Sequence, residues 1–293
     1  MMRKLFVYCM RQTDDSFCTR TTRHIAKKLA MPLGACTITE FSDGELFVRI
    51  DQDVQDQDVW VLAGTQTPAE NMFELFFLLD ALQRSGARIN LFVTYFSYAR
   101  QIIADQGEAL NAQVICNILK QFTVIKICVI HPHSLLLHNF LSFKSVYDRD
   151  FFCELAESYD AIAAPDQGAV LLAQDIAQKT GKSLIVLKKN RPEHDKVEIS
   201  SLEGNVNRLK ILIVDDMIST GNTLVQAAKS LLKEGAISVA AAATHGVFSP
   251  GARDFLESSP LEKIFITNTI DQLSLGKIMV SDITPRIKKI MLQ

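Results

Sequence analysis

The amino-acid sequence predicts an α/β protein made of two domains of similar size, each with a mainly parallel sheet flanked by helices. Short β-branched runs alternate with amphipathic stretches along most of the 293 residues, which is typical of strands joined by crossover helices. A second series of such units begins after about residue 145, so we expect domains at 1–145 and 146–293. The chain is long enough for each domain to have its own core.

The first half contains strand and helix signals in this alternation. Pro32 follows the first expected helix, and Gly86 follows the second, as is usual beyond a helix C-terminus. We expect strands at 4–9, 46–50, 59–63, 88–95 and 124–130, and helices at 16–30, 69–85 and 109–121.

The second half repeats the alternation from Asp160 onward. The stretch 189–204 is polar and shows no periodicity, so we expect a mobile loop there. We expect strands at 160–164, 183–188, 209–214, 236–243 and 262–267, and helices at 168–180, 222–233 and 284–292.

The composition excludes several classes of partner and location. Basic residues (31) and acidic residues (33) are spread along the chain, so a long nucleic acid is not expected as a partner. The most apolar stretch, residues 72–82, contains Glu74 and Asp80, so no membrane-spanning segment is expected. The six cysteines include no C-x-x-C pair and suggest buried thiols of a reducing compartment, for which the cytoplasm is the default.

One strand–turn–helix element, residues 211–232, has residues that indicate a ligand site. In residues 211–232 a buried strand ends at Asp215 and Asp216, a turn of small residues follows, and a helix begins. Ligands of open α/β sheets bind at the carboxyl ends of strands. The turn offers backbone N–H groups at a helix N-terminus, which is a natural seat for a phosphate. Its residues are Ser219, Thr220, Gly221, Asn222 and Thr223.

Two adjacent carboxylates would repel a phosphate, so Asp215 and Asp216 need another partner. Sugar hydroxyls or a magnesium ion would serve. Phosphate, diol and metal together describe a ribose phosphate. The alternative is an acidic N-capping turn without a ligand. The sequence contains no G-x-x-x-x-G-K-[ST] loop, so a P-loop enzyme is excluded.

The segment VDDMISTGNT (214–223) resembles the phosphoribosyl-diphosphate (PRPP) binding loop of type I phosphoribosyltransferases. Five more segments resemble those of the ribose-phosphate diphosphokinase (PRPP synthetase) family, in the family's order over nearly the whole chain. They are FSDGEL (41–46), YFSYARQ (95–101), APDQG (164–168), KKNRP (188–192) and ATHGVFS (243–249). The resemblance implies two phosphoribosyltransferase-like domains, homodimers or hexamers, and Mg²⁺-dependent transfer of a diphosphoryl group from ATP to ribose 5-phosphate, giving PRPP and AMP.

The resemblance also implies roles for particular residues. The ATP-binding residues are Phe41, Asp43, Gly44, Glu45, Arg100 and Gln101. His133 and Asp166 are associated with the metal, and His133, Lys189 and Arg191 are catalytic. Ribose 5-phosphate is bound by Arg191, Asp215, Asp216 and the five turn residues from Ser219 to Thr223.

Each of these assignments has a simpler alternative. Lys189 and Arg191 can neutralise a transferring diphosphoryl group, but by themselves they read as a solvated basic turn. Arg100 is equally well a surface arginine, and the FSDGEL turn a plain connector. His131, His133 and His138 raise the alternative of a transition-metal site, although no nearby carboxylate has convincing spacing.

The chain departs from the family pattern at several positions. Ile102 and Ile103 replace an acidic and a basic residue, and His131 stands in place of an aspartate. Further departures are Leu172, Asn190 and Ser219. They leave open a catalytically weak regulatory subunit of a synthetase. A transferase that consumes PRPP is disfavoured, because a single-domain transferase would not need the FSDGEL and YARQ segments.

Overall fold

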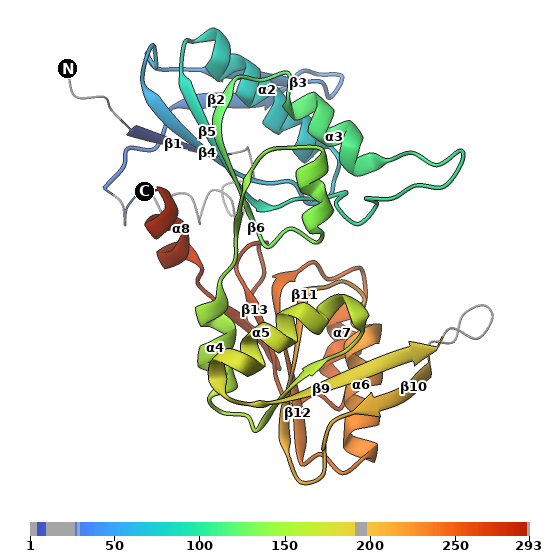
Figure 1. The fold of residues 1–293 in the computed structure, drawn as a ribbon. Helices are drawn as coiled ribbons and strands as arrows, with labels where there is room; N and C mark the ends of the chain where they lie inside the picture. The colour runs from blue at the N-terminus through green and yellow to red at the C-terminus, as the bar shows by residue number, and fades with distance from the viewer. Residues whose placement is uncertain (1–4, 10–26, 28–29, 191–197, 292–293) are drawn as a thin grey trace. The chain divides into compact units, whose positions relative to one another are not determined.

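A computed structural model describes residues 5–9, 27, 30–190 and 198–291 (Figure 1). It divides into two compact units. The first unit comprises Met1–Tyr147, Thr269–Asp271 and Ile283–Gln293, and the second comprises Asp148–Asn268 and Gln272–Asp282. Each unit has a mainly parallel sheet flanked by helices, as the sequence predicts. No helix among the described residues has the length and hydrophobicity needed to cross a bilayer.

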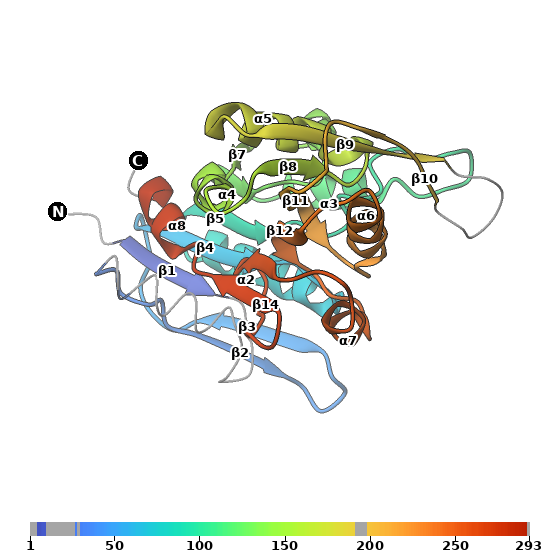
Figure 2. The same ribbon diagram turned by 90° about the horizontal axis from the view of Figure 1, so that it is seen from below.

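The sheet of the first unit has five parallel strands in the order β1-β4-β5-β6-β7. They are β1 (Leu5–Cys9), β4 (Asp58–Gly64), β5 (Arg88–Tyr95), β6 (Val124–Ile130) and β7 (Lys144–Val146). Apolar residues of α2 (Glu70–Arg84) and α3 (Asn111–Leu119) cover one face of this sheet. Two further strands, β2 (Cys36–Glu40) and β3 (Leu46–Ile50), form an antiparallel hairpin, visible in Figure 2.

The other face of the first sheet is covered by the C-terminal helix α8 (Thr284–Met291). Ile287 and Ile290 of this helix share a buried cluster with Val7, Trp60 and Phe92 of the sheet. The sequence-based division near residue 145 places this segment in the second domain, whereas in the structure it packs on the first sheet. Local sequence predicts the helix but not the sheet on which it packs.

The sheet of the second unit has seven strands in the order β10-β9-β8-β11-β12-β13-β14. Only the β9–β10 pair is antiparallel, and Figure 1 shows it as a long ribbon at the sheet edge. The strands are β8 (Ala161–Ala164), β9 (Ser183–Asn190), β10 (Glu198–Glu203), β11 (Lys210–Ile218), β12 (Ser238–Gly246), β13 (Ile264–Thr267) and β14 (Ile278–Ser281).

The helices of the second unit are α4 (Arg149–Ala156), α5 (Val170–Thr180), α6 (Asn222–Lys233) and α7 (Ala252–Glu257). Leu224, Val225 and Leu231 of α6 and Leu256 of α7 pack on one face of the sheet. The helix α5 packs against β8, β9 and β11 and also against α4.

Several elements differ from the sequence-based expectation. The predicted loop 189–204 includes strand β10, whose sequence EISSLE is too polar to signal a strand; residues 191–197 lie outside the described part. The predicted helix 16–30 lies almost entirely outside it as well. The short elements β2, β7, α4, α7 and β14 were not predicted.

Candidate functional site

The site of the second unit is built at the carboxyl end of β11. Residues 211–214 are fully buried in the sheet, and the strand continues through Asp215 and Asp216, which are half-buried. The backbone N–H of Asp216 donates a hydrogen bond to Oδ1 of Asp215, at 2.9 Å. Asp215 also lies opposite Ala243 of the neighbouring strand β12. The sheet therefore fixes both carboxyl groups at one end of adjacent parallel strands.

A third carboxyl group belongs to the same end of the sheet. Asp166 follows β8, the other neighbour of β11, and its side chain accepts a hydrogen bond from the backbone N–H of Gly168 at 3.1 Å. Burial raises the pKa of Asp215 well above its usual range, and the charges of Asp216 and Asp166 raise it further. A cation or a set of hydroxyl donors would relieve this concentration of negative charge.

The turn after β11 has the geometry of an anion site. Gly221 has φ +81°, a conformation that L-residues rarely adopt, and a Cβ there would lie 2.7 Å from Cδ2 of Leu256. The helix α6 begins directly after it and has no side-chain cap hydrogen bond. The Asn222 N–H donates weakly to Oγ1 of Thr220, at 3.3 Å. Such a helix N-terminus can accept a phosphate.

The structure adds one residue that the sequence analysis did not assign. The hydroxyl of Ser249, in the segment after β12, lies 3.0 Å from the hydroxyl of Ser219. The sequence segment ATHGVFS (243–249) ends at Ser249 but indicates no role for it. The two hydroxyls come together across the fold, because the β11–β12 pairing places residue 246 beside residue 218.

The ATP-binding residues predicted in FSDGEL form the tip of the β2–β3 hairpin in the first unit. The Phe41 N–H donates to the Glu45 carbonyl at 2.8 Å, and the Glu45 N–H donates to Oδ1 of Asp43 at 3.1 Å. Gly44 has φ +91° and completes the turn. The Phe41 side chain is 56% exposed, so the tip presents an aromatic ring and two carboxyl groups to solvent.

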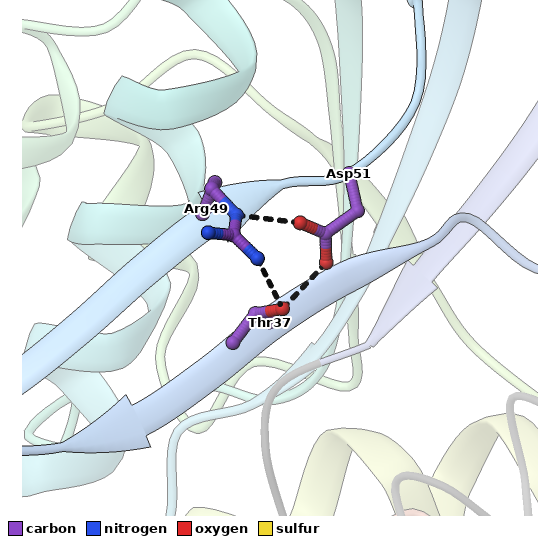
Figure 3. Close-up of polar contacts among 3 residues, drawn as sticks. All are labelled: Thr37, Arg49 and Asp51. Carbon is purple, nitrogen blue, oxygen red and sulfur yellow. Dashed lines mark hydrogen bonds and ion pairs between the residues drawn. The ribbon is translucent and has the colours of Figure 1, made fainter.

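A polar cluster at the other end of the hairpin ties its two strands together (Figure 3). The Thr37 hydroxyl and the Arg49 Nε each donate to a carboxylate oxygen of Asp51, both at 2.6 Å. The Arg49 Nη2 lies 3.4 Å from the Thr37 hydroxyl. The hydrogen bond from Thr37 and the interaction with Arg49 lower the pKa of Asp51.

Arg100 and Gln101 follow β5 in a well-supported loop. The Thr65 hydroxyl donates to the carbonyl of Tyr95 at 2.8 Å and accepts from the Ser97 N–H at 2.9 Å, which fixes the start of the loop. Arg100 is exposed, whereas Oε1 of Gln101 accepts a hydrogen bond from the Asn111 side chain at 2.6 Å. The loop therefore presents the Arg100 guanidinium while the side chain of Gln101 contacts the start of α3.

The histidines after β6 do not form the alternative transition-metal site. Nε2 of His138 lies 3.1 Å from the Ser145 hydroxyl, and its ring stacks on Phe143 at 4.0 Å. The His131 ring packs edge-on against Tyr147. Within the part of the chain that the structure describes, no three His, Cys, Asp or Glu side chains are placed to hold a metal ion. His133 is exposed in the same segment.

The predicted residues thus fall into two groups. Asp166, Asp215, Asp216 and the turn residues belong to the second unit, whereas the FSDGEL tip, Arg100, Gln101 and His133 belong to the first. Lys189 lies in β9, paired with Ile199 of β10, and Arg191 lies outside the described residues.

Two family models match separate parts of this chain. Residues 16–122 match the family described as the N-terminal domain of ribose phosphate pyrophosphokinase, and residues 177–290 match the phosphoribosyl synthetase-associated domain. A ribose-phosphate pyrophosphokinase of Aquifex aeolicus is 33% identical over 279 residues, covering 91% of this chain and 89% of the relative. One from Chlorobaculum tepidum is 32% identical over 264 residues, covering 86% and 82%.

A crystal structure of the phosphoribosylpyrophosphate synthetase from Mycobacterium smegmatis superimposes with a TM-score of 0.88 at 26% identity, over 99% of this chain and 98% of the other. The similarity thus extends over both units and includes the strand–turn–helix element at Asp215. On these grounds the chain belongs to the ribose-phosphate pyrophosphokinase family.

Proposed function

We propose that this protein transfers the diphosphoryl group of ATP to the anomeric hydroxyl of ribose 5-phosphate, giving PRPP and AMP. The observation that carries the proposal is the arrangement at the end of β11, where paired carboxyl groups precede a helix N-terminus whose N-cap residue is Gly221. A sugar phosphate satisfies both, because its hydroxyls donate to carboxylates and its phosphate accepts from backbone N–H groups. Membership of the pyrophosphokinase family supports the reaction.

The reaction balances without a further reactant. The anomeric oxygen of ribose 5-phosphate forms a bond to the β-phosphorus of ATP. The bond between that phosphorus and the oxygen bridging to the α-phosphorus breaks, and its electron pair leaves with AMP. The hydroxyl proton goes to solvent. Because charge moves onto phosphate oxygens, the protein's contribution is positioning and cationic stabilisation.

The ribose-phosphate loop, residues 215–223, is proposed to bind the acceptor. The carboxyl groups of Asp215 and Asp216 would accept hydrogen bonds from ribose hydroxyls, and the N-terminus of α6 together with Ser219, Thr220 and Thr223 would bind the 5-phosphate. Arg191 is proposed to assist at the same ligand. The left-handed Gly221 lets the backbone approach the phosphate closely.

The remaining assigned residues are proposed to act on ATP. The hairpin tip (Phe41, Asp43, Gly44 and Glu45) is proposed to bind the nucleoside, because its aromatic ring and carboxyl groups are exposed. Arg100 and Gln101 are proposed to bind the triphosphate. Lys189, Arg191 and His133 are proposed to stabilise charge on the transferring group.

The donor set of the second unit fits Mg²⁺. This ion prefers oxygen ligands and is commonly held by one or two carboxylates together with substrate phosphates, not by an all-protein cage. Asp166 and the Asp215–Asp216 pair offer such oxygens at this end of the sheet. Because no three of the described carboxyl groups surround one point, substrate phosphates would supply the remaining ligands. His133 is proposed to contribute on the ATP side. When bound, the ion supplies charge neutralisation of the phosphates.

Identification of the nucleotide product tests the proposal. The purified protein is incubated with Mg²⁺, ATP and ribose 5-phosphate, and the products are separated by ion-exchange chromatography. AMP and PRPP in equal amounts are expected. Formation of ADP would indicate transfer of a single phosphoryl group and would contradict the proposed reaction.

A second function, a catalytically weak subunit that associates with an active synthetase, is favoured by the region beside Arg100. Ile102 packs against the hydrophobic core, and Ile103 is 73% exposed, so neither offers a polar group to a triphosphate. This alternative expects no AMP even at high protein concentration, together with a change in the activity of an added family member.

The proposed setting of the protein is the cytoplasm, as a homodimer or hexamer, without nucleic-acid or membrane partners. Burial raises the pKa of the Cys116 thiol to about 11 and also raises that of Cys128, as suits structural thiols in a reducing compartment. Exposed apolar side chains on α2, Phe73 and Phe77, are compatible with self-association. Light scattering coupled to size-exclusion chromatography tests the oligomeric state.

A further inference from the structure

The segment of residues 246–249 forms a second layer beside the ribose-phosphate loop. The backbone N–H groups of Val247 and Phe248 both donate to the carbonyl of Ile218, at 2.9 and 3.0 Å. The Ser249 N–H donates to the Ser219 carbonyl at 3.1 Å, and the two serine hydroxyls lie 3.0 Å apart. The position of Ser219 therefore depends on the conformation of a segment outside the loop.

That conformation is strained. Phe248 has φ +44°, in the left-handed region that bulky residues avoid. Such residues persist only where the surrounding structure holds them. The Phe248 ring packs against the hydrophobic core of the second unit. The guanidinium of Arg253, a residue of α7, lies over this ring, with Cζ 5.1 Å from the ring centroid. Arg253 thus holds the ring by a cation–π contact.

The same guanidinium reaches the segment by a second route. Arg253 donates to Oε1 of Gln272 and, at 3.4 Å, to the carbonyl of Leu273. Nε2 of Gln272 in turn donates to the carbonyl of Gly246 at 2.8 Å. A Cβ at Gly246 would lie 2.5 Å from Cδ1 of Ile266, so a side chain there would have to displace that methyl group. One arginine therefore contacts the segment directly at Phe248 and through Gln272 at Gly246.

We propose that Arg253 is a positioning residue for the ribose-phosphate loop. Its planar guanidinium lies over the Phe248 ring and holds the Gly246 carbonyl through Gln272, and Ser249, the residue after Phe248, places its hydroxyl beside that of Ser219. The inference rests on the proposed function, since ribose 5-phosphate is the ligand that Ser219 would bind. It goes further by adding Arg253, Gln272 and Ser249, none of which enters the proposed site.

The test compares Arg253→Met, which keeps most of the aliphatic length but has no donor, with the unsubstituted protein. We expect the KM for ribose 5-phosphate to rise about fivefold or more, corresponding to one lost hydrogen bond, with the KM for ATP unchanged. Arg253→Lys, which restores the charge but not the fork, should recover part of the loss. Arg84→Met, at an exposed arginine paired with Asp80 on α2 of the first unit, is the matched control and should change neither KM.

Direct binding separates this proposal from the proposed reaction. Titration calorimetry with ribose 5-phosphate should show weaker binding to Arg253→Met, and a similar loss for Ser249→Ala, whereas Ser258→Ala at the end of α7 should bind normally. Binding without AMP formation would overturn the reaction but leave the positioning role intact. Unchanged affinity in Ser249→Ala, a parallel rise in both KM values for Arg253→Met, or no binding by the unsubstituted protein would overturn the role of Arg253.

Discussion

Burial, together with the neighbouring Asp216 and Asp166, opposes ionisation of the Asp215 carboxyl group and so raises its pKa. Because its folded-state pKa is raised above the unfolded value of about 4, the folded protein holds the proton more tightly than the unfolded chain does. The stability associated with this group is therefore full at acid pH and is lost as pH rises from about 4 through the folded pKa. A buried carboxyl group that lowers the stability of the folded protein at neutral pH is expected where a bound ligand offsets that loss.

Substitution of Asp215 by asparagine should stabilise the metal-free, ligand-free protein at neutral pH while removing turnover. We expect the melting temperature at neutral pH to rise, because asparagine has no carboxyl group whose ionisation is opposed by burial and by Asp216. The gain should shrink toward acid pH, where the carboxyl group is protonated in both states. Thermal unfolding followed by circular dichroism across this pH range measures it, and a lower melting temperature for the variant at neutral pH would contradict the argument.

Gly221 should tolerate no side chain. In Gly221→Ala the positive φ and the 2.7 Å approach to Leu256 act together, so we expect a loss of about 2–4 kcal/mol in the free energy of unfolding. Gly181→Ala is a matched control, because Gly181 also has a positive φ (+67°) but nothing within 4 Å of its Cβ position. That variant should lose only about 1 kcal/mol. Urea unfolding gives both values, and equal losses would show that the contact with Leu256 relaxes freely.

At the scale of elements, the β9–β10 ribbon supplies Lys189. If this residue stabilises the transferring group, Lys189→Ala should lower kcat by two or more orders of magnitude, about the effect of removing one stabilising charge in an active site. The adjacent Lys188 pairs with Glu203 across the ribbon, so Lys188→Ala is a close control and should retain most of the activity. Similar kcat values for the two variants would contradict the proposed role of Lys189 in stabilising the transferring group.

The β2–β3 hairpin depends on the Thr37–Arg49–Asp51 cluster shown in Figure 3. The pKa of Asp51 is lowered in the folded state, so its contribution is present at neutral pH and is lost as pH falls through the folded pKa. Asp51→Asn should speed amide hydrogen exchange in β2 and β3 and leave β4 and β5 unchanged. Asp80→Asn, which breaks an ion pair on α2, should not affect the hairpin. Unchanged exchange in Asp51→Asn would show that the cluster contributes little.

The elements differ in how far sequence could predict them. The β11–turn–α6 unit was predicted closely, because its buried run, glycine and amphipathic helix are each local signals. Of the pair β9–β10, only β9 was predicted, because the polar segment EISSLE forms a strand by pairing with β9. Strand signals placed Asp166 after one strand and Asp215 near the end of another, as the structure has them, and their binding roles stay predictions. The contacts of Ser249 and Arg253 could not be predicted, since they are made across the fold.

At the scale of the whole molecule, the two units were predicted but the path of the chain was not. The α/β alternation gives two sheets, whereas the return of α8 to the first sheet depends only on packing. Ile287 is fully buried there, so Ile287→Ala should cost about 2–4 kcal/mol. Hydrogen exchange should speed up in β1 and β4 and not in β11 or β12. The exposed neighbour Lys289 provides the control substitution, Lys289→Ala, and protection loss confined to the second unit would contradict the placement of α8.

The place of α8 also sets an order for synthesis of the protein. Strands β1 to β7 leave the ribosome first, yet Trp60, Leu62 and Phe92 on one face of their sheet stay without the covering helix until residues 284–291 have been made. Domains usually fold in the order of their synthesis. Here the second unit can bury its core before the first has acquired all of its own, so the half of the molecule that is made first is the half that is finished last.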